Sequence, residues 1–468
     1  MKQATIRESG THDFDSLPIP LEDRNWGGWA AAAVAATAGI ASWSFVVGGF
    51  TSYYVGAREG TATMIAGALI GQLLVTISQV PAVTKFGIET LGSTKPQLGV
   101  KGSILALLVQ YATLIGWNLV LTIFLGRAVA SVLVAEGLIG EASSGTAAII
   151  SSLIGTLLIW LMLQKGSDGV RSVGVVVACC IMGLGAWMYW LLFQHFSLED
   201  ILAAAPIAPN EGGQLTNYTT AFELLIVSTL GWWAYMGAMF RMLNSAGKGT
   251  VPSMASLGFG WAAAGLIGLY SGLVAGEADP TVWILKVAGP AAGVFVLIFV
   301  ALANLGSTLV GAHAAALGVG QFSPITQRLS WNAKVATALV PMSVVIVLFP
   351  GAFYDNVGTF MAFIGIVIAP MIGVQIVDWY FLRRLNSLHV PSLYWHDTRS
   401  RYWYTAGFNL VGILALLGGS LVYIALLDPV TFVPNSWLFQ YTGATLPAAF
   451  SGGLIYWIGS TIFSKRSG

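Results

Sequence analysis

Apolar residues occur in this chain as long stretches separated by short polar connections. A helix needs about 20 apolar residues to cross roughly 30 Å of hydrocarbon. Stretches of this kind lie at residues 29–55, 62–84, 103–131, 146–164, 172–194, 218–240, 254–275, 291–320, 335–350, 357–382, 403–427 and 444–464. The pattern predicts twelve membrane-spanning helices, and no connection between them is long enough for a soluble domain.

Composition leads to the same class. Hydrophobic residues make up 56% of the 468 residues and charged residues only 9%, whereas charged residues form about 25% of a typical soluble domain. The mean hydropathy is +0.77. We therefore expect an all-α polytopic membrane protein. Its transmembrane domain would cover residues 29–464, between a cytoplasmic N-terminal tail at 1–28 and a cytoplasmic end at 465–468.

The distribution of basic residues predicts the orientation. If the N-terminus is cytoplasmic, only Arg58, Arg127 and Lys286 of the 21 Lys and Arg residues fall outside or at the outer ends of spans. The other eighteen lie inside, as the positive-inside rule requires, and the reversed topology would put them on the wrong side. We expect a multi-pass protein of the inner (plasma) membrane with both termini in the cytoplasm.

One polar cluster interrupts the apolar stretch 291–320. Asn304, Ser307 and Thr308 have the spacing i, i+3, i+4, so on a helix their side chains face the same way. Unpartnered polar groups are costly in hydrocarbon. The cluster therefore indicates either a small-residue packing face or a site for a hard cation such as Na+, which prefers oxygen ligands. These three residues alone do not decide between the two.

Glycines interrupt the first and sixth predicted spans. Gly39, Gly48 and Gly49 lie in the first span with Gly56 directly after it, and Gly231 lies in the sixth. Transporters built from two inverted five-helix repeats have discontinuous helices at these two positions, with the binding site at the breaks. Glycine also allows close helix packing in membranes, so this pattern supports the interpretation without deciding it.

Three tryptophans lie in the middle of predicted spans rather than at the membrane interfaces, where tryptophan normally collects. They are Trp117 in the third span and Trp232 and Trp233 in the sixth. Two indoles that face one cavity can hold a flat ring between them by stacking. The alternative for each of them is ordinary packing in the helix bundle.

Four sequence blocks together resemble the nucleobase:cation symporter family, which includes permeases for cytosine and purines, uracil, thiamine precursors, allantoin and hydantoin. The most specific block is a Pro-Gly helix that ends in Asp378-Trp379-Tyr380 and paired arginines. The four blocks span most of the chain and lie at residues 18–26, 85–117, 231–241 and 370–384.

The resemblance implies a fold and an activity. The fold is a five-plus-five inverted-repeat core of the leucine-transporter type, at about 29–382, with two further helices at about 403–464. The activity is import of a small planar nucleobase-like or ureide compound by cation symport with alternating access. The resemblance also places Na+ between carbonyls of the first span and side chains of the eighth. By position in this chain the expected cation ligands are Ala38, Ala41, Asn304, Ser307 and Thr308.

The chain departs from the family at positions that read the substrate. Leu114 and Leu121 flank Trp117, where the family often has a glutamine about one turn away; Ala238 replaces a common acid, and His313 replaces an asparagine. A buried polar group without a partner costs about 1–3 kcal/mol, so such changes should alter specificity. The expected substrate-binding residues are Ser42, Thr113, Trp117, Asn118, Ser228, Thr229, Trp232, Trp233 and His313, with Tyr235 and Gln375 as further candidates.

Other functions are less well supported by the residues. An enzyme would need a nucleophile, an acid pair or metal ligands inside the bilayer, and a channel would need a ring of selectivity groups. The charge of a histidine changes near neutral pH, so His313 leaves proton coupling open. The alternative function is a proton-coupled permease of the same family for a small nitrogen compound that is not a nucleobase. We expect a transporter that functions as a monomer in the lipid bilayer, with Na+ (or H+) as coupling ion, no cofactor, no further metal and no nucleic-acid partner.

Overall fold

The computed structural model describes residues 17–40, 42–351 and 356–464. Within these ranges, eight helical segments are long and apolar enough to cross a membrane. They are α3 (Ala57–Phe86), α5 (Ser103–Ala135), η3 with α6 (Glu141–Met162), the Val176–His195 part of α7 (Gly166–His195), α11 to α12 (Gly247–Ala275), α14 (Pro290–Gly320), α16 (Trp331–Leu348) and α18 with η7 (Val357–Leu382).

The remaining four predicted spans also correspond to helices, two of them interrupted. α1 (Gly28–Gly39) and α2 (Ser42–Tyr54) form one span bent by 51°. α9 (Gly213–Leu230) continues through the 3-10 segment η5 (Gly231–Tyr235) into α10 (Met236–Phe240). α19 (Leu410–Leu426) and α21 (Thr445–Ser464) correspond to the last two stretches. Every predicted span thus has a helical counterpart, and the prediction of an all-helical polytopic membrane protein is confirmed.

The short elements lie mostly in the connections between spans. Two π-helical segments, η6 (Ser253–Gly260) and η7 (Asp378–Leu382), instead lie within spans. The other short elements are η2 (Leu21–Asp23), α4 (Thr90–Leu98), η3 (Glu141–Ser143), η4 (Leu163–Lys165), α8 (Leu198–Ala203), α13 (Pro280–Ala288), α15 (Pro324–Gln327), η8 (Val390–Tyr394) and α20 (Phe439–Thr442).

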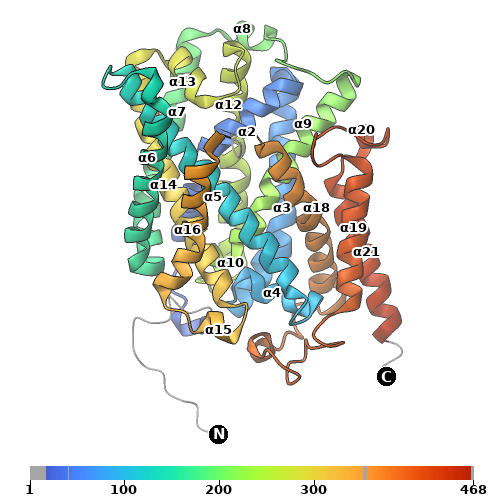
Figure 1. The fold of residues 1–468 in the computed structure, drawn as a ribbon. Coiled ribbons are helices and arrows are strands. Elements are labelled where there is room, and N and C mark those ends of the chain that lie inside the picture. Colours follow the sequence, from blue (N-terminus) through green and yellow to red (C-terminus); the bar gives the residue numbers. More distant parts are fainter. Residues whose placement is uncertain (1–16, 41, 352–355, 465–468) are drawn as a thin grey trace.

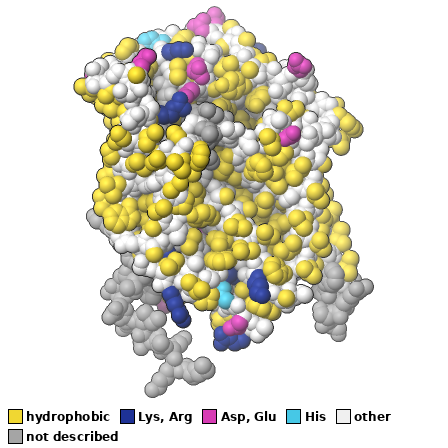
Figure 2. All heavy atoms as spheres, viewed as in Figure 1, with side chains coloured by type: hydrophobic (Ala, Val, Ile, Leu, Met, Phe, Trp, Pro, Cys, Tyr) yellow, Lys and Arg dark blue, Asp and Glu magenta, His cyan; other side chains and the backbone are white. Residues whose placement is uncertain are grey.

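The helices form one bundle with two distinct ends. In Figure 1, α6 and α7 lie at one edge of the bundle, α19 and α21 lie at the opposite edge, and α5 crosses the middle. The beginning of α1 and the end of α21 lie at the same end, as an even number of crossings requires. Figure 2 shows hydrophobic side chains over the middle of the molecule and charged side chains at its two ends. This distribution is that of a protein surrounded by hydrocarbon.

Glycines allow the closest helix contacts. A Cβ at Gly48 of α2 would come within 1.9 Å of the carbonyl oxygen of Gly265 in α12. A Cβ at Gly268 would come within 2.2 Å of the Phe45 carbonyl oxygen. Any larger residue would force the two helices apart. α2 and α12 are therefore packed backbone against backbone, as small residues permit in membranes.

A buried carboxylate fixes the C-terminal helices to the core. Glu223 of α9 accepts hydrogen bonds from the backbone N–H groups of Ala444 (3.0 Å) and Thr445 (2.9 Å), where α21 begins. The first N–H groups of a helix have no partner within the helix, and the Glu223 side-chain oxygens satisfy two of them here. This contact therefore holds the start of α21 against α9.

Candidate functional site

The break between α1 and α2 redirects backbone hydrogen bonds. In a continuous helix the N–H of Ser42 would donate to the carbonyl of Ala38. Instead, the Ser42 N–H and hydroxyl both donate to Oδ1 of Asn304 on α14, at 3.2 and 2.7 Å. The break therefore releases the Ala38 carbonyl from the helix.

The released Ala38 carbonyl oxygen accepts hydrogen bonds from two side chains. One donor is the hydroxyl of Ser307 on α14 at 2.8 Å, and the other is the indole N–H of Trp43 at 3.4 Å. A carbonyl oxygen has two lone pairs. Both are thus directed toward side chains at the junction of α1, α2 and α14.

The polar face of α14 lies against this break. Asn304, Ser307 and Thr308 are all buried. Among the described residues, neither the Thr308 hydroxyl nor the Asn304 side-chain NH₂ group has a hydrogen-bond partner. α14 can approach α1 because Gly306 faces Thr37, whose methyl group would lie 2.8 Å from a Cβ at that position.

The structure thus brings together Ala38, Asn304 and Ser307, three of the five residues expected to bind a cation, and Thr308 is buried next to Ser307 on α14. Ala41 lies outside the described residues. The set offers a carbonyl, an amide and two hydroxyl oxygens, with no carboxylate among them. Such neutral oxygens are ligands for a hard cation of low charge.

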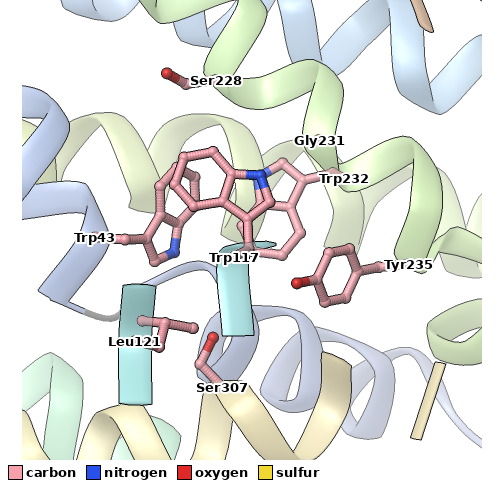
Figure 3. A pocket seen from close by; sticks show the side chains of 8 residues that line it. All are labelled: Trp43, Trp117, Leu121, Ser228, Gly231, Trp232, Tyr235 and Ser307. Atoms are coloured by element: carbon pink, nitrogen blue, oxygen red, sulfur yellow. The ribbon is translucent and has the colours of Figure 1, made fainter. Parts of the chain in front are cut away.

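A small cavity lies directly beside the break. Its free volume is about 10 Å³, which is room for about one water molecule. Figure 3 shows three indoles gathered at its centre, with the Tyr235 ring to one side and Ser307 close by. The lining residues are Trp43, Trp117, Leu121, Ser228, Gly231, Trp232, Tyr235 and Ser307.

Trp43 occupies the centre of this aromatic group. Its ring centroid lies 4.9 Å from that of Trp117, 5.1 Å from that of Trp232 and 5.0 Å from that of Trp261 on α12. Contacts of this length are typical of aromatic pairs. Trp43 was not among the predicted site residues. The available signal was a tryptophan directly after the break in the first span.

Trp117 and Trp232 are positioned by their neighbours. A Cβ at Gly231 would come within 2.6 Å of Nε1 of Trp117, so only glycine lets that indole lie against η5. Phe360 packs edge-on against Trp117 with a centroid distance of 5.5 Å. Tyr235 packs in the same way against Trp232 at 5.1 Å. Both indoles also contact the Trp43 ring.

Three other predicted substrate-binding residues do not line the cavity. Ser42 is bonded to Asn304 as described above, and the hydroxyl of Thr229 lies over Gly71 of α3. The indole N–H of Trp233 donates to Oε1 of Gln375 at 2.7 Å. That glutamine oxygen also accepts from Gln79, so Trp233 belongs to a polar network between α3 and α18.

The last three predicted residues are buried away from the lining. The Asn118 amide packs against Gly311 of α14, and neither of its polar atoms has a partner among the described residues. The hydroxyl of Thr113 is likewise buried without a partner in the described part of the chain. The His313 ring packs against Trp331 of α16, at a centroid distance of 5.6 Å. A role for these residues in substrate binding stays a prediction.

Comparison with known families identifies the class of protein. Residues 18–458 match the family described as permeases for cytosine/purines, uracil, thiamine and allantoin. The chain belongs to this family of permeases. It is a transporter and not an enzyme, and the resemblance inferred from the sequence blocks is confirmed.

Individual relatives are distant in sequence but similar in fold. The permease is 20% identical over 464 residues to the purine-uracil permease NCS1 of Arabidopsis thaliana, covering 89% of this chain and 73% of the relative. It superposes on Mhp1, a nucleobase-cation-symport-1 family transporter in a closed conformation with bromovinylhydantoin bound, with a TM-score of 0.80 at 15% identity, covering 97% and 96% of the two chains. A Na+-coupled sialic acid symporter matches with a TM-score of 0.60 at 13% identity, covering 98% and 93%. The expected leucine-transporter-type core is thereby confirmed.

Proposed function

We propose that this permease imports a small planar nucleobase-like or ureide compound by Na+ symport with alternating access. One observation carries the proposal. The break in the first span places a neutral oxygen cluster and an aromatic cavity side by side, and Ser307 belongs to both. An ion and a ring bound at these places would be immediate neighbours.

The chemistry of the break supports a monovalent cation. The Ala38 carbonyl and the hydroxyls of Ser307 and Thr308 are uncharged, so they would not be left as buried anions when the ion departs. The Thr308 hydroxyl has no other hydrogen-bond partner among the described residues that it would have to give up. The sialic acid symporter of similar fold is described as Na+-coupled.

The aromatic cavity supports a flat substrate. Its walls are mostly indole and phenol rings, which bind other rings by stacking. The few polar groups are the indole N–H groups and the hydroxyls of Ser228, Tyr235 and Ser307, so hydrogen bonding there would be sparse and directional. The purine-uracil permease is named for planar nitrogen rings, and Mhp1 has bromovinylhydantoin, which contains another such ring, bound.

The charge pattern supports one orientation in the membrane. We place residues 29–464 in the inner (plasma) membrane as one transporter domain that functions as a monomer, with the tail and the C-terminal end in the cytoplasm. Supporting this orientation, Arg58, Arg127 and Lys286 are the only basic residues that this topology assigns outside or to the outer ends of spans. Cysteine labelling of intact cells at residues 3 and 467 would test the orientation, since external labelling at either end contradicts it.

Uptake into proteoliposomes tests the proposal. A thermal-shift screen against bases, ureides and thiamine-type pyrimidines, with and without Na+, first identifies a ligand. Its uptake is then measured under an inward Na+ gradient and with choline in place of Na+ at fixed pH. We expect uptake to require Na+. Unchanged uptake in choline would refute Na+ coupling and make the proton the leading candidate for the coupling ion, with His313 as the first residue to substitute.

A further inference from the structure

A side chain of the permease itself lies where a flat ring would be expected to bind. Trp43, in the first turn of α2, is only 3% exposed and has Trp117 and Trp232 at 4.9 and 5.1 Å. The remaining space holds about one water molecule. A ring compound has no room to stack on Trp117 or Trp232 in this cavity unless a lining side chain moves, and Trp43 is the side chain that contacts both.

The same side chain contacts the candidate cation site. Its N–H donates to the carbonyl oxygen of Ala38, which also accepts from Ser307. Because both lone pairs of this oxygen are engaged, an ion that binds to it must displace at least one donor. The positive end of the indole N–H dipole would also oppose a cation at that oxygen.

We propose that Trp43 couples the two sites by occupying both of them. In the state described here, its ring fills the substrate position and its N–H holds the cation-binding carbonyl. A cation at the Ala38 carbonyl removes the hydrogen bond that retains the indole, and the released indole opens the cavity. The inference rests on the proposed function and assigns its coupling to one residue.

The packing around α2 indicates that the side chain moves rather than the helix. Gly48 and Gly268 hold α2 and α12 together with no space between their backbones. Tilting α2 alone would break this contact over several turns. Rotation about the side-chain bonds of Trp43 leaves it intact.

This arrangement predicts how the affinities are linked. If the cavity is open in only a fraction of molecules, the apparent affinity of a ring compound is reduced by that fraction. Na+ raises the fraction and tightens ring binding, and a bound ring must tighten Na+ binding by the same factor. Without Trp43, the cavity is open in all molecules and the factor approaches 1.

Free indole is a suitable probe because it has the shape of the group that must leave. Apolar cavities bind small aromatic molecules of matching shape. Calorimetry would follow binding of NaCl, with choline chloride holding the ionic strength constant, and binding of indole at zero and saturating Na+. In the wild type we expect Na+ to tighten indole binding. In Trp43→Ala, indole should bind equally well with and without Na+.

Trp43→Phe separates the two contacts of the residue. A phenyl ring still fills much of the cavity but has no N–H, so Na+ should bind about 2- to 10-fold more tightly, as expected for one net hydrogen bond. Indole binding should remain weak. Trp283→Phe is the matched control, because Trp283 is likewise a buried tryptophan but packs against Phe45 outside the cavity lining. It should leave both affinities unchanged.

The outcomes distinguish this inference from the proposed function. Na+ binding that is lost in Ser307→Ala but unchanged in both Trp43 variants overturns the inference and leaves the proposed function intact. Failure of Trp43→Ala to bind indole also overturns it, because the cavity then does not depend on Trp43. A wild type that binds no Na+ overturns the proposed function itself.

Discussion

Replacing Ser307 with alanine removes one hydroxyl from the junction of α1, α2 and α14. That hydroxyl is 2% exposed and donates to the Ala38 carbonyl oxygen at 2.8 Å. In the Na+-bound state that we propose, the Ser307 hydroxyl oxygen would turn toward the ion and become one of its ligands. The substitution should therefore weaken Na+ binding more than it weakens the fold.

The size of the effect follows from the ligand that the ion loses. A hydrogen-bond-type interaction of a polar group with a charged partner contributes about 1.5–3 kcal/mol. The substitution also frees the Ala38 carbonyl from one of its two donors, which offsets part of this loss and leaves about 1–2 kcal/mol. Each 1.4 kcal/mol is about a factor of ten, so the half-maximal Na+ concentration for uptake should rise about 5- to 30-fold.

Uptake measured over a series of Na+ concentrations, together with thermal unfolding of the purified protein, would check this. Ser152→Ala is a matched control. Ser152 of α6 is also 2% exposed, and its hydroxyl donates to the carbonyls of Ala148 (2.8 Å) and Thr122 (3.0 Å), away from the break. The Ser152→Ala variant should lose about as much thermal stability as Ser307→Ala, with no change in the Na+ dependence of uptake.

The reasoning is refuted if the two serine variants behave alike. Equal loss of thermal stability with unchanged half-maximal Na+ in both would mean that Ser307 only joins α14 to α1. A rise in half-maximal Na+ in both would mean that Na+ dependence reports general loosening of the bundle.

Three further predictions concern other parts of the molecule. Trp117→Ala should reduce substrate affinity at least tenfold by calorimetry while Trp117→Phe keeps part of it, because stacking tolerates a smaller ring; equal losses of stability and affinity would favour a packing role. Gly231→Ala should lower uptake without preventing membrane insertion, since its Cβ would displace the Trp117 indole; normal uptake would contradict the position of that ring. Burial lowers the pKa of Lys95, outside the spanning helices, from 10.5 to about 8. Between these values the unfolded chain binds more protons, so wild-type stability should rise with pH relative to Lys95→Met in thermal melts, and parallel curves would show that burial does not shift this pKa.

The fold could be predicted from hydropathy because hydrocarbon leaves helices few alternatives. Long apolar stretches therefore gave every span, although local irregularities did not follow from them. The 3-10 segment Gly231–Tyr235 and the π-helical turns at 253–260 and 378–382 depend on how neighbouring helices pack. Hydropathy contains no information about that packing.

The site was predicted less completely, for a geometric reason. Neighbouring residues on a helix point about 100° apart, so Ser228 faces the cavity while Thr229 faces α3. Trp232 and Trp233 separate in the same way. Across the 51° bend between α1 and α2, helical periodicity does not predict which way a side chain points. No sequence rule therefore indicated that Trp43 would face the cavity. The oxygen cluster was found because Asn304, Ser307 and Thr308 share one uninterrupted helix.

The glycine contacts between α2 and α12 have a use in measuring transport. Two helices that touch at Gly48 and Gly265 are expected to keep one separation throughout the cycle. Spin labels at the exposed ends of α2 and α12 would therefore give an internal reference distance, and its distribution should stay narrow in every condition. A second pair that joins α12 to α14 would show whichever change Na+ or substrate produces. Spectra of the two pairs would separate motion within the protein from disorder of the labels.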